Sequence, residues 1–142
     1  MSRSGDPHEI LQGPLYYGIA FVALTLVFWK TSPAGIIALM LMCGGDGIAD
    51  LVGRHFNSPK LPWSREKSLA GSLGVLLGGF VLALFVIWIY VMLGIFVGPL
   101  RSYLLPLGLI ALVGMLVESL PYKDIDNITV TVAAALVGYF LL

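Results

Sequence analysis

The longest apolar stretch of the chain covers residues 69–100 and reads LAGSLGVLLGGFVLALFVIWIYVMLGIFVGPL, without one charged side chain. A helix needs about 20 mainly apolar residues to cross a membrane, so this stretch is more than long enough for one span. We predict a single helix here that tilts strongly or breaks near its glycines, which are Gly71, Gly74, Gly78 and Gly79. The stretch indicates that the fold forms in a lipid bilayer.

The composition of the whole chain agrees with a membrane environment. Of its 142 residues, 58% are hydrophobic and only 11% are charged, and the mean hydropathy of +0.96 is far above that of soluble domains. Further apolar runs cover residues 15–29, 34–54, 103–120 and 128–142, and the second of these becomes polar partway along. We predict an all-α, polytopic integral membrane helical bundle of about five transmembrane helices, forming one domain over residues 1–142.

The balance of charge excludes one class of partner. Eight basic and eight acidic side chains give a net charge of zero, so no overall field attracts nucleic acid. The single cysteine, Cys43, also excludes an intrachain disulfide and any multi-cysteine metal site. Whatever the charged side chains do, they act locally.

The number of spans predicts which connections share a side of the membrane. With five crossings, residues 1–14, the polar segment 55–67 and the turn 122–127 lie on one side. Six basic residues fall there, and two, Lys30 and Arg101, fall on the other side; the six are Arg3, Arg54, Lys60, Arg65, Lys67 and Lys123. The positive-inside rule places the polar loop between the second and third helices in the cytoplasm or an equivalent compartment such as the stroma.

A polar stripe lies on the second predicted helix. Asp46, Asp50 and Arg54 are spaced i, i+4 and i+8, so they share one helix face, and Gly45 and Gly47 leave the backbone beside them open to close approach. Each ionisable group within a span costs about 2.5 to 3.5 kcal/mol, so such groups are candidates for a functional site. The alternative interpretation is a buried structural pair of Asp and Arg.

Acidic and basic residues of this region suit a metal and a nucleoside triphosphate. The carboxylates of Asp46 and Asp50 are one helical turn apart and suit Mg²⁺, which takes oxygen ligands and shares them with substrate phosphates. The triphosphate would be bound by basic side chains, namely Arg54, Lys60, Arg65 and Lys67. The same basic residues could instead serve only as positive-inside anchors.

Further polar residues should return to the same side of the membrane. Glu118 ends the fourth apolar run, and it is a candidate base or metal ligand or, alternatively, an acid that merely reaches the interface from a helix end. Asp126 and Asn127 precede the last run and could support the acceptor side of the site or simply cap a helix. The sequence has no phosphate-binding loop of the soluble kind and no protein-kinase signature.

Three segments carry a resemblance to a known family. Residues 44–54 (GGDGIADLVGR), followed by KLPW at 60–63 and KSLAGS at 67–72, resemble the signature of the phytol kinase and farnesol kinase branch of the polyprenol kinase family. VESLP at 117–121 and DNITV at 126–130 resemble its second signature, and residues 4–17 resemble the segment that precedes both. Family members are integral membrane enzymes that transfer a phosphoryl group, typically from CTP, to an isoprenoid alcohol.

The resemblance implies a specific assignment of roles. Phytol is the expected alcohol, with farnesol or geranylgeraniol as the other choices, and Mg²⁺ would be held by Asp46 and Asp50. CTP would be bound by residues of the first signature: Gly45, Gly47, Arg54, Lys60, Lys67 and Ser68. Asp50 or Glu118 would assist the alcohol in phosphoryl transfer. Family members usually carry further spans before the matching region, so we expect this chain to lack N-terminal spans.

Two other functions remain open on the sequence alone. A phosphatidate cytidylyltransferase also joins an acidic, glycine-containing helix to a Gly-Arg pair and a downstream Lys-Ser sequence, but it releases pyrophosphate rather than CDP. A channel or transporter would use Asp46, Asp50 and Glu118 as an ion path. The segments at 117–121 and 126–127 favour the kinase over the first, and the basic segment 55–67 argues against the second.

Overall fold

The computed structural model of the protein describes residues 7–28, 31–56, 58–121 and 126–142. Within these ranges the chain forms five helices and one short β hairpin. The helices are α1 (Pro7–Phe28), α2 (Ala34–His55), α3 (Leu69–Met92), α4 (Arg101–Glu118) and α5 (Asp126–Leu141), and the hairpin consists of β1 (Lys60–Leu61) and β2 (Ser64–Ser68). The prediction of an all-α helical membrane protein is confirmed.

The helices differ in how well they match a membrane span. Among the described residues, three helical segments are long and apolar enough to cross a membrane: Ala34–Gly53, Leu69–Met92 and Arg101–Glu118. The apolar parts of the first and last helices, Pro14–Phe28 and Ile128–Leu141, are shorter. The five-span topology therefore stays a prediction.

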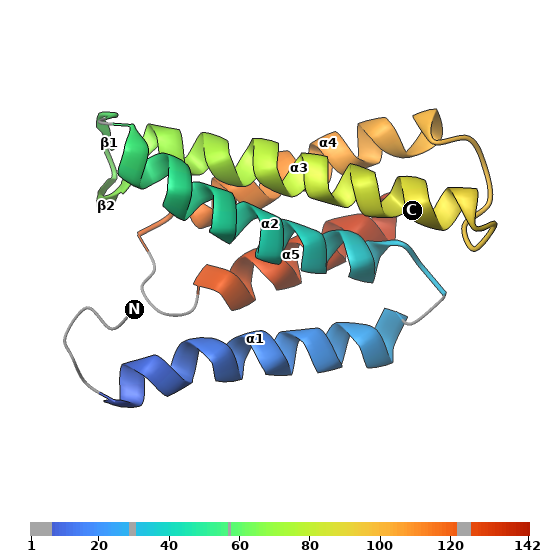
Figure 1. The fold of residues 1–142 in the computed structure, drawn as a ribbon, viewed down its shortest axis with the longest axis horizontal. Coiled ribbons are helices and arrows are strands. Elements are labelled where there is room, and N and C mark those ends of the chain that lie inside the picture. Colours follow the sequence, from blue (N-terminus) through green and yellow to red (C-terminus); the bar gives the residue numbers. More distant parts are fainter. Residues whose placement is uncertain (1–6, 29–30, 57, 122–125) are drawn as a thin grey trace.

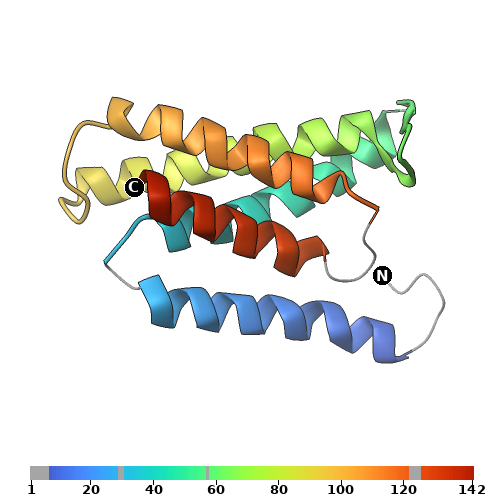
Figure 2. The ribbon, with the colours of Figure 1, turned by 180° about the vertical axis from the view of Figure 1, so that it is seen from behind.

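Successive helices run in opposite directions along the bundle (Figures 1 and 2). Helices α2 to α5 pack together, and α1 lies along the edge of the bundle against α2 and α5. This alternation places the end of α2, the hairpin, the start of α3, the end of α4 and the start of α5 at one end of the molecule, which we call the polar end (Figure 1). The predicted meeting of the polar segments is thus a property of the fold.

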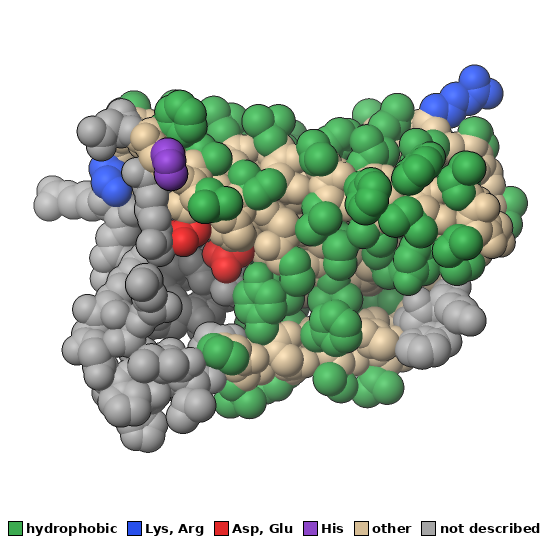
Figure 3. Space-filling view, in the orientation of Figure 1, with side chains coloured by type: hydrophobic (Ala, Val, Ile, Leu, Met, Phe, Trp, Pro, Cys, Tyr) green, Lys and Arg blue, Asp and Glu red, His purple; other side chains and the backbone are tan. Residues whose placement is uncertain are grey.

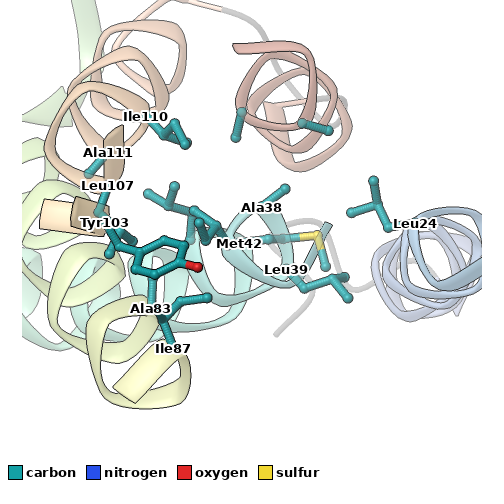
Figure 4. Packing of buried hydrophobic residues seen from close by; sticks show 14 of the residues in the cluster. Leu24, Ala38, Leu39, Met42, Ala83, Ile87, Tyr103, Leu107, Ile110 and Ala111 are labelled. Atoms are coloured by element: carbon teal, nitrogen blue, oxygen red, sulfur yellow. The ribbon is translucent and has the colours of Figure 1, made fainter. Parts of the chain in front are cut away.

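The hydrophobic core lies in the half of the bundle farther from the polar end, because its members in α2 and α4 come mainly from the first halves of those helices and those in α3 from the second half. Figure 4 shows part of this packing. Ile37, Ala38 and Leu41 of α2 follow helical spacing and are almost fully buried. They pack with residues of the other helices such as Ile87 of α3 and Leu107 of α4. Large hydrophobic side chains are also exposed on the outside of all five helices, and Figure 3 shows one such apolar face, as expected for helices that face lipid rather than water.

Glycines bring α2 and α3 into close contact. A Cβ atom added at Gly78 would lie 2.8 Å from the main-chain oxygen of Gly44, and one added at Gly74 would lie 2.9 Å from the Cα atom of Ala49. Small residues at such an interface let two backbones approach, which is how helices associate where burial from water gives little driving force. The polar half of α2 is therefore fixed directly against the first half of α3.

The structure corrects the predicted course of α3. The single helix is continuous through all four of its early glycines and ends at Met92. Of the two predicted alternatives, a break near those glycines was wrong and a strong tilt stays a prediction; a helix reaching residue 100 was also wrong. Gly94 adopts a φ of 70°, and the amides of Gly94 and Ile95 bond to the carbonyls of Val91 and Tyr90. This arrangement is a Schellman motif, which stops a helix whatever the hydropathy of the next residues.

The polar connection between α2 and α3 also differs from the predicted loop. Strands β1 and β2 pair antiparallel, with Lys60 opposite Ser68 and Leu61 opposite Ser64. Leu61 and Ser64 are buried, so the hairpin has an inner side that packs on the bundle. The basic residues of this segment are consequently carried on a small folded element.

Candidate active site at the polar end

An ion pair joins the hairpin to the end of α4. The ammonium nitrogen of Lys67 on β2 lies 3.1 Å from Oε1 of Glu118, the last residue of α4, and also donates to the main-chain oxygen of Glu118. The two side chains are 14% and 22% exposed, so water screens the pair only partly. A cation at this position also interacts favourably with the C-terminal end of the helix dipole.

Two further hydrogen bonds surround this pair. The indole nitrogen Nε1 of Trp63 donates to the main-chain oxygen of Ser119 at 3.0 Å. The hydroxyl of Ser72, in the first turn of α3, lies 3.4 Å from Oε2 of Glu118. We call these five residues, Trp63, Lys67, Ser72, Glu118 and Ser119, the clamp, because they tie the hairpin and α3 to the end of α4.

The base of the hairpin is joined to the start of α3. Ser68 is the N-cap of α3, and its hydroxyl oxygen accepts a hydrogen bond from the amide of Gly71 at 3.1 Å. The Ser58 hydroxyl accepts from the amide of Ala70, and the Pro59 carbonyl accepts from the amide of Leu69. Ser68, predicted to bind the nucleotide, therefore has a structural role in the fold, and its nucleotide role stays a prediction.

The carboxylates of α2 lie on an exposed face near the polar end. Asp46 and Asp50 are both exposed, and Figure 3 shows acidic side chains beside the histidine side chain near that end. Asp46 interacts electrostatically with the Tyr17 hydroxyl of α1, which itself donates to the main-chain oxygen of Met42 at 3.0 Å. The two predicted metal ligands are thus accessible to a ligand that approaches from outside the bundle.

The two predicted nucleotide glycines occupy different environments. Gly45 is buried, and an added Cβ atom there would lie 3.1 Å from Cγ1 of Val75, so the absence of a side chain serves the packing of α2 on α3. Gly47 is exposed, and a Cβ atom added there would meet no atom within 4 Å. The structure therefore leaves open space at Gly47 and none at Gly45.

Other predicted residues also lie at the polar end. Lys60 is exposed on β1, and Arg54 lies in the last turn of α2, four residues after Asp50. Asp126 and Asn127 begin α5 at the same end. Several groups lie outside the described part of the structure: the side chains of Arg54, Arg65, Asp126 and Asn127, and the residues Arg3, Lys30 and Lys123 entirely.

Comparison with known proteins shows which enzymes the chain is similar to. The chain is 44% identical over 142 residues to the probable phytol kinase 1, chloroplastic, of Glycine max. It is 40% identical over 141 residues to the phytol kinase 1, chloroplastic, and 39% identical over 143 residues to the farnesol kinase, chloroplastic, both of Arabidopsis thaliana. The chain is a homologue of the phytol and farnesol kinases. The resemblance inferred from the sequence motifs is confirmed.

The chain matches only part of each of these relatives. The alignments cover 98% or more of this chain but only 46% or 47% of the phytol and farnesol kinases, so the chain spans about half the length of these relatives. No family model matches the chain, and no solved structure matches it. The three apolar helices that are long enough to span a bilayer indicate a membrane-associated protein.

The donor atoms at the polar end fit Mg²⁺ only if substrate completes the coordination. Within the described side chains, no group of three His, Cys, Asp or Glu residues could hold a metal ion. Mg²⁺ commonly binds through one or two carboxylates, with substrate phosphates and water as the other ligands. Asp46 and Asp50 offer carboxylates of this kind, and a bound triphosphate would have to supply further oxygens.

The sequence predicted no role for three of the clamp residues. Trp63, Ser72 and Ser119 all lie within segments that resemble the kinase signatures, but their contacts cross between elements far apart in the chain. One signal could have suggested Trp63: a helix end leaves unpaired carbonyls, and a tryptophan in a nearby polar segment offers an N–H donor.

Proposed function

We propose that this protein phosphorylates an isoprenoid alcohol, phytol first and farnesol or geranylgeraniol as alternatives, with CTP as the donor. The observation that supports it most directly is the meeting, at one end of an apolar bundle, of a basic hairpin, the exposed carboxylates of α2 and the acid that ends α4. Relatives named phytol kinase and farnesol kinase match nearly the whole chain. A phosphoryl transfer to a lipid alcohol needs both a charged region and an apolar one, and the bundle offers both.

In this proposal the basic side chains hold the triphosphate. Lys60 on β1 and Lys67 on β2 are carried by the hairpin, and Arg54 ends the acidic stripe of α2. Asp46 and Asp50 would hold Mg²⁺, which when bound supplies positive charge to the phosphate oxygens. Gly47 leaves space beside this stripe for the nucleotide.

The reaction itself requires positioning and one proton acceptor. The hydroxyl oxygen of the alcohol forms a bond to the γ-phosphorus, the bond from that phosphorus to the β–γ bridging oxygen breaks, and CDP leaves with the bond's electrons. The hydroxyl proton passes to a carboxylate, either Asp50 or Glu118. Lys67 and Ser72 orient the carboxylate of Glu118, which suits it to receive a proton in a fixed direction.

The fold also suggests where the reaction occurs. The basic residues of the hairpin favour the cytoplasmic or stromal side of the membrane for the polar end. The apolar outer faces of the helices would receive the isoprenoid tail from the bilayer. The alcohol group would then meet the donor at the membrane surface.

The test uses CTP labelled separately in its α- and γ-phosphates, with purified protein, Mg²⁺ and each of the three alcohols. We expect the γ label in the prenyl monophosphate and release of CDP. Transfer of the α label to phosphatidate with release of pyrophosphate would instead support a cytidylyltransferase. No transfer from a well-folded sample, with ion flux through vesicles that contain the protein, would support a channel.

A further inference from the structure

We propose that Trp63 is a positioning residue for the nucleotide donor, acting through its hydrogen bond to the end of α4. This inference rests on the proposed function, because it concerns how the donor-binding hairpin is held. Trp63 touches neither donor nor acceptor in this proposal. It fixes the hairpin, and the hairpin carries Lys60 and Lys67.

The first argument is that the hairpin is too small to keep its position alone. Strand β1 has two residues and β2 has five, and an isolated two-stranded hairpin is only marginally stable. Its base is held by the Ser58 and Pro59 bonds to the start of α3. Its turn, at residues 62–63, lies farthest from that base, and the buried residues beside it, Leu61 and Ser64, hold it by packing.

The second argument concerns the contact itself. The Trp63 side chain is 57% exposed, so burial alone does not hold the ring in place. Its indole N–H is nevertheless bonded to the Ser119 carbonyl, 56 residues away in the chain. Of the ring's interactions, the directional N–H bond is therefore the one that specifies the position of the turn.

The third argument is that α4 needs the bond as much as the hairpin does. A helix leaves its last carbonyls without partners, and here the hairpin supplies donors to two of them, Lys67 to Glu118 and Trp63 to Ser119. Trp63 lies in the turn and Lys67 lies near the base of β2, so the two bonds hold the hairpin at two separate points. Loss of the Trp63 bond would leave the turn held only by the packing of the two buried residues beside it, which is not directional, so the turn and Lys60 would be less precisely placed.

The experiment replaces the tryptophan with phenylalanine, which keeps an aromatic ring but is smaller and has no N–H donor. In Trp63→Phe, we expect the KM for MgCTP to rise about two- to tenfold, the range expected for loss of one hydrogen bond. The kcat and the KM for phytol should change less than about twofold, and the helical circular dichroism should match that of the original protein. Trp88→Phe is the matched control, because Trp88 is an exposed residue of α3 far from the hairpin, and it should leave all values unchanged.

A second readout does not depend on activity. Trypsin can cut the hairpin after Lys60, Arg65 or Lys67, and a loosened turn should be cut about two- to tenfold faster in Trp63→Phe than in Trp88→Phe. Equal cutting rates would overturn the fastening role of Trp63. Faster cutting with an unchanged KM for MgCTP would overturn the role of Trp63 in positioning the nucleotide. If the original protein transfers no phosphoryl group, the proposed function fails, and the trypsin comparison alone still decides whether Trp63 fastens the hairpin.

Discussion

The close contact of α2 and α3 predicts that an added methyl group destabilises the fold, and the size of this effect follows from distances in the structure. In Gly74→Ala, the new Cβ atom would lie 2.9 Å from Cα of Ala49, 3.2 Å from its nitrogen and 3.3 Å from the main-chain oxygen of Ile48. Carbon atoms pack at about 3.5 to 4.0 Å. All three neighbours are backbone atoms, so no side chain can rotate away. The helices must separate locally by about 0.5 to 1 Å.

A glycine-to-alanine control at an open position separates the cost of overpacking from the gain in helix propensity. Overpacking of this kind costs about 1 to 3 kcal/mol, whereas replacing a helical glycine by alanine gains up to about 1 kcal/mol. Gly108→Ala in α4 carries the same gain, but its Cβ atom would meet nothing within 4 Å. The difference between the two variants should therefore be about 1 to 3 kcal/mol, with Gly74→Ala the less stable.

The measurement is the free energy of unfolding in mixed micelles, followed by helical circular dichroism as denaturing detergent is added. Because Asp50 directly follows Ala49, the displacement should also reach the proposed metal site. A misplacement of about 1 Å can reduce a rate by about 100-fold, so we expect turnover to fall by about 10- to 100-fold in Gly74→Ala. Equal stability of the two alanine variants would refute the close packing of α2 on α3.

Two other experiments test the site directly. Asp46→Asn should abolish phosphoryl transfer without unfolding the protein, as judged by circular dichroism, and a variant with near-normal turnover would remove Asp46 from the metal role. A double-mutant cycle of Lys67→Met and Glu118→Gln, measured by detergent unfolding, should give a coupling energy of about 1 to 3 kcal/mol, because the pair is less exposed than surface pairs but not fully buried. A coupling near zero would show that the two side chains do not stabilise each other.

Much of the fold could be predicted, because it is determined by the lengths of the apolar stretches and by the residues that begin or end helices. Residues 34 and 69 were predicted as starts of apolar helices, and α2 and α3 begin there. Pro33 precedes the first, and Ser68 caps the second. Alternation of direction then placed the polar segments together, since it follows from the number of helices alone.

The end of α3 could not be predicted in the same way. Hydropathy stays high through residue 100, and the stop depends on a left-handed backbone at Gly94. Four earlier glycines in α3 look equally able to interrupt a helix. They do not, because Gly74 and Gly78 face α2, where a missing side chain strengthens packing instead of weakening the helix. Composition cannot separate these two uses of glycine.

The contacts of the candidate site were the least predictable part. Glu118 and Lys67 were each predicted as functional residues, but nothing in the sequence pairs residues 51 positions apart. Their meeting depends on where the hairpin's second strand lies against the end of α4. That position is set by the register of β1 with β2 and by the clamp, and both are properties of the folded chain.

The glycine-rich stretch of α2 brings the carboxylates of α2 and the basic hairpin together through its packing on α3. Its acids occupy an exposed face, whereas Gly44 and Gly45 lie against α3. A Cβ atom added at Gly44 would lie 2.8 Å from Cδ2 of Leu82, and one added at Gly45 would lie 3.1 Å from Cγ1 of Val75. Larger residues at these two positions would push α3 away from α2, and with it the hairpin that ends at the N-cap of α3. The small residues of the motif therefore act on the site through distance: they bring a basic element close to an acidic one across two packed helices.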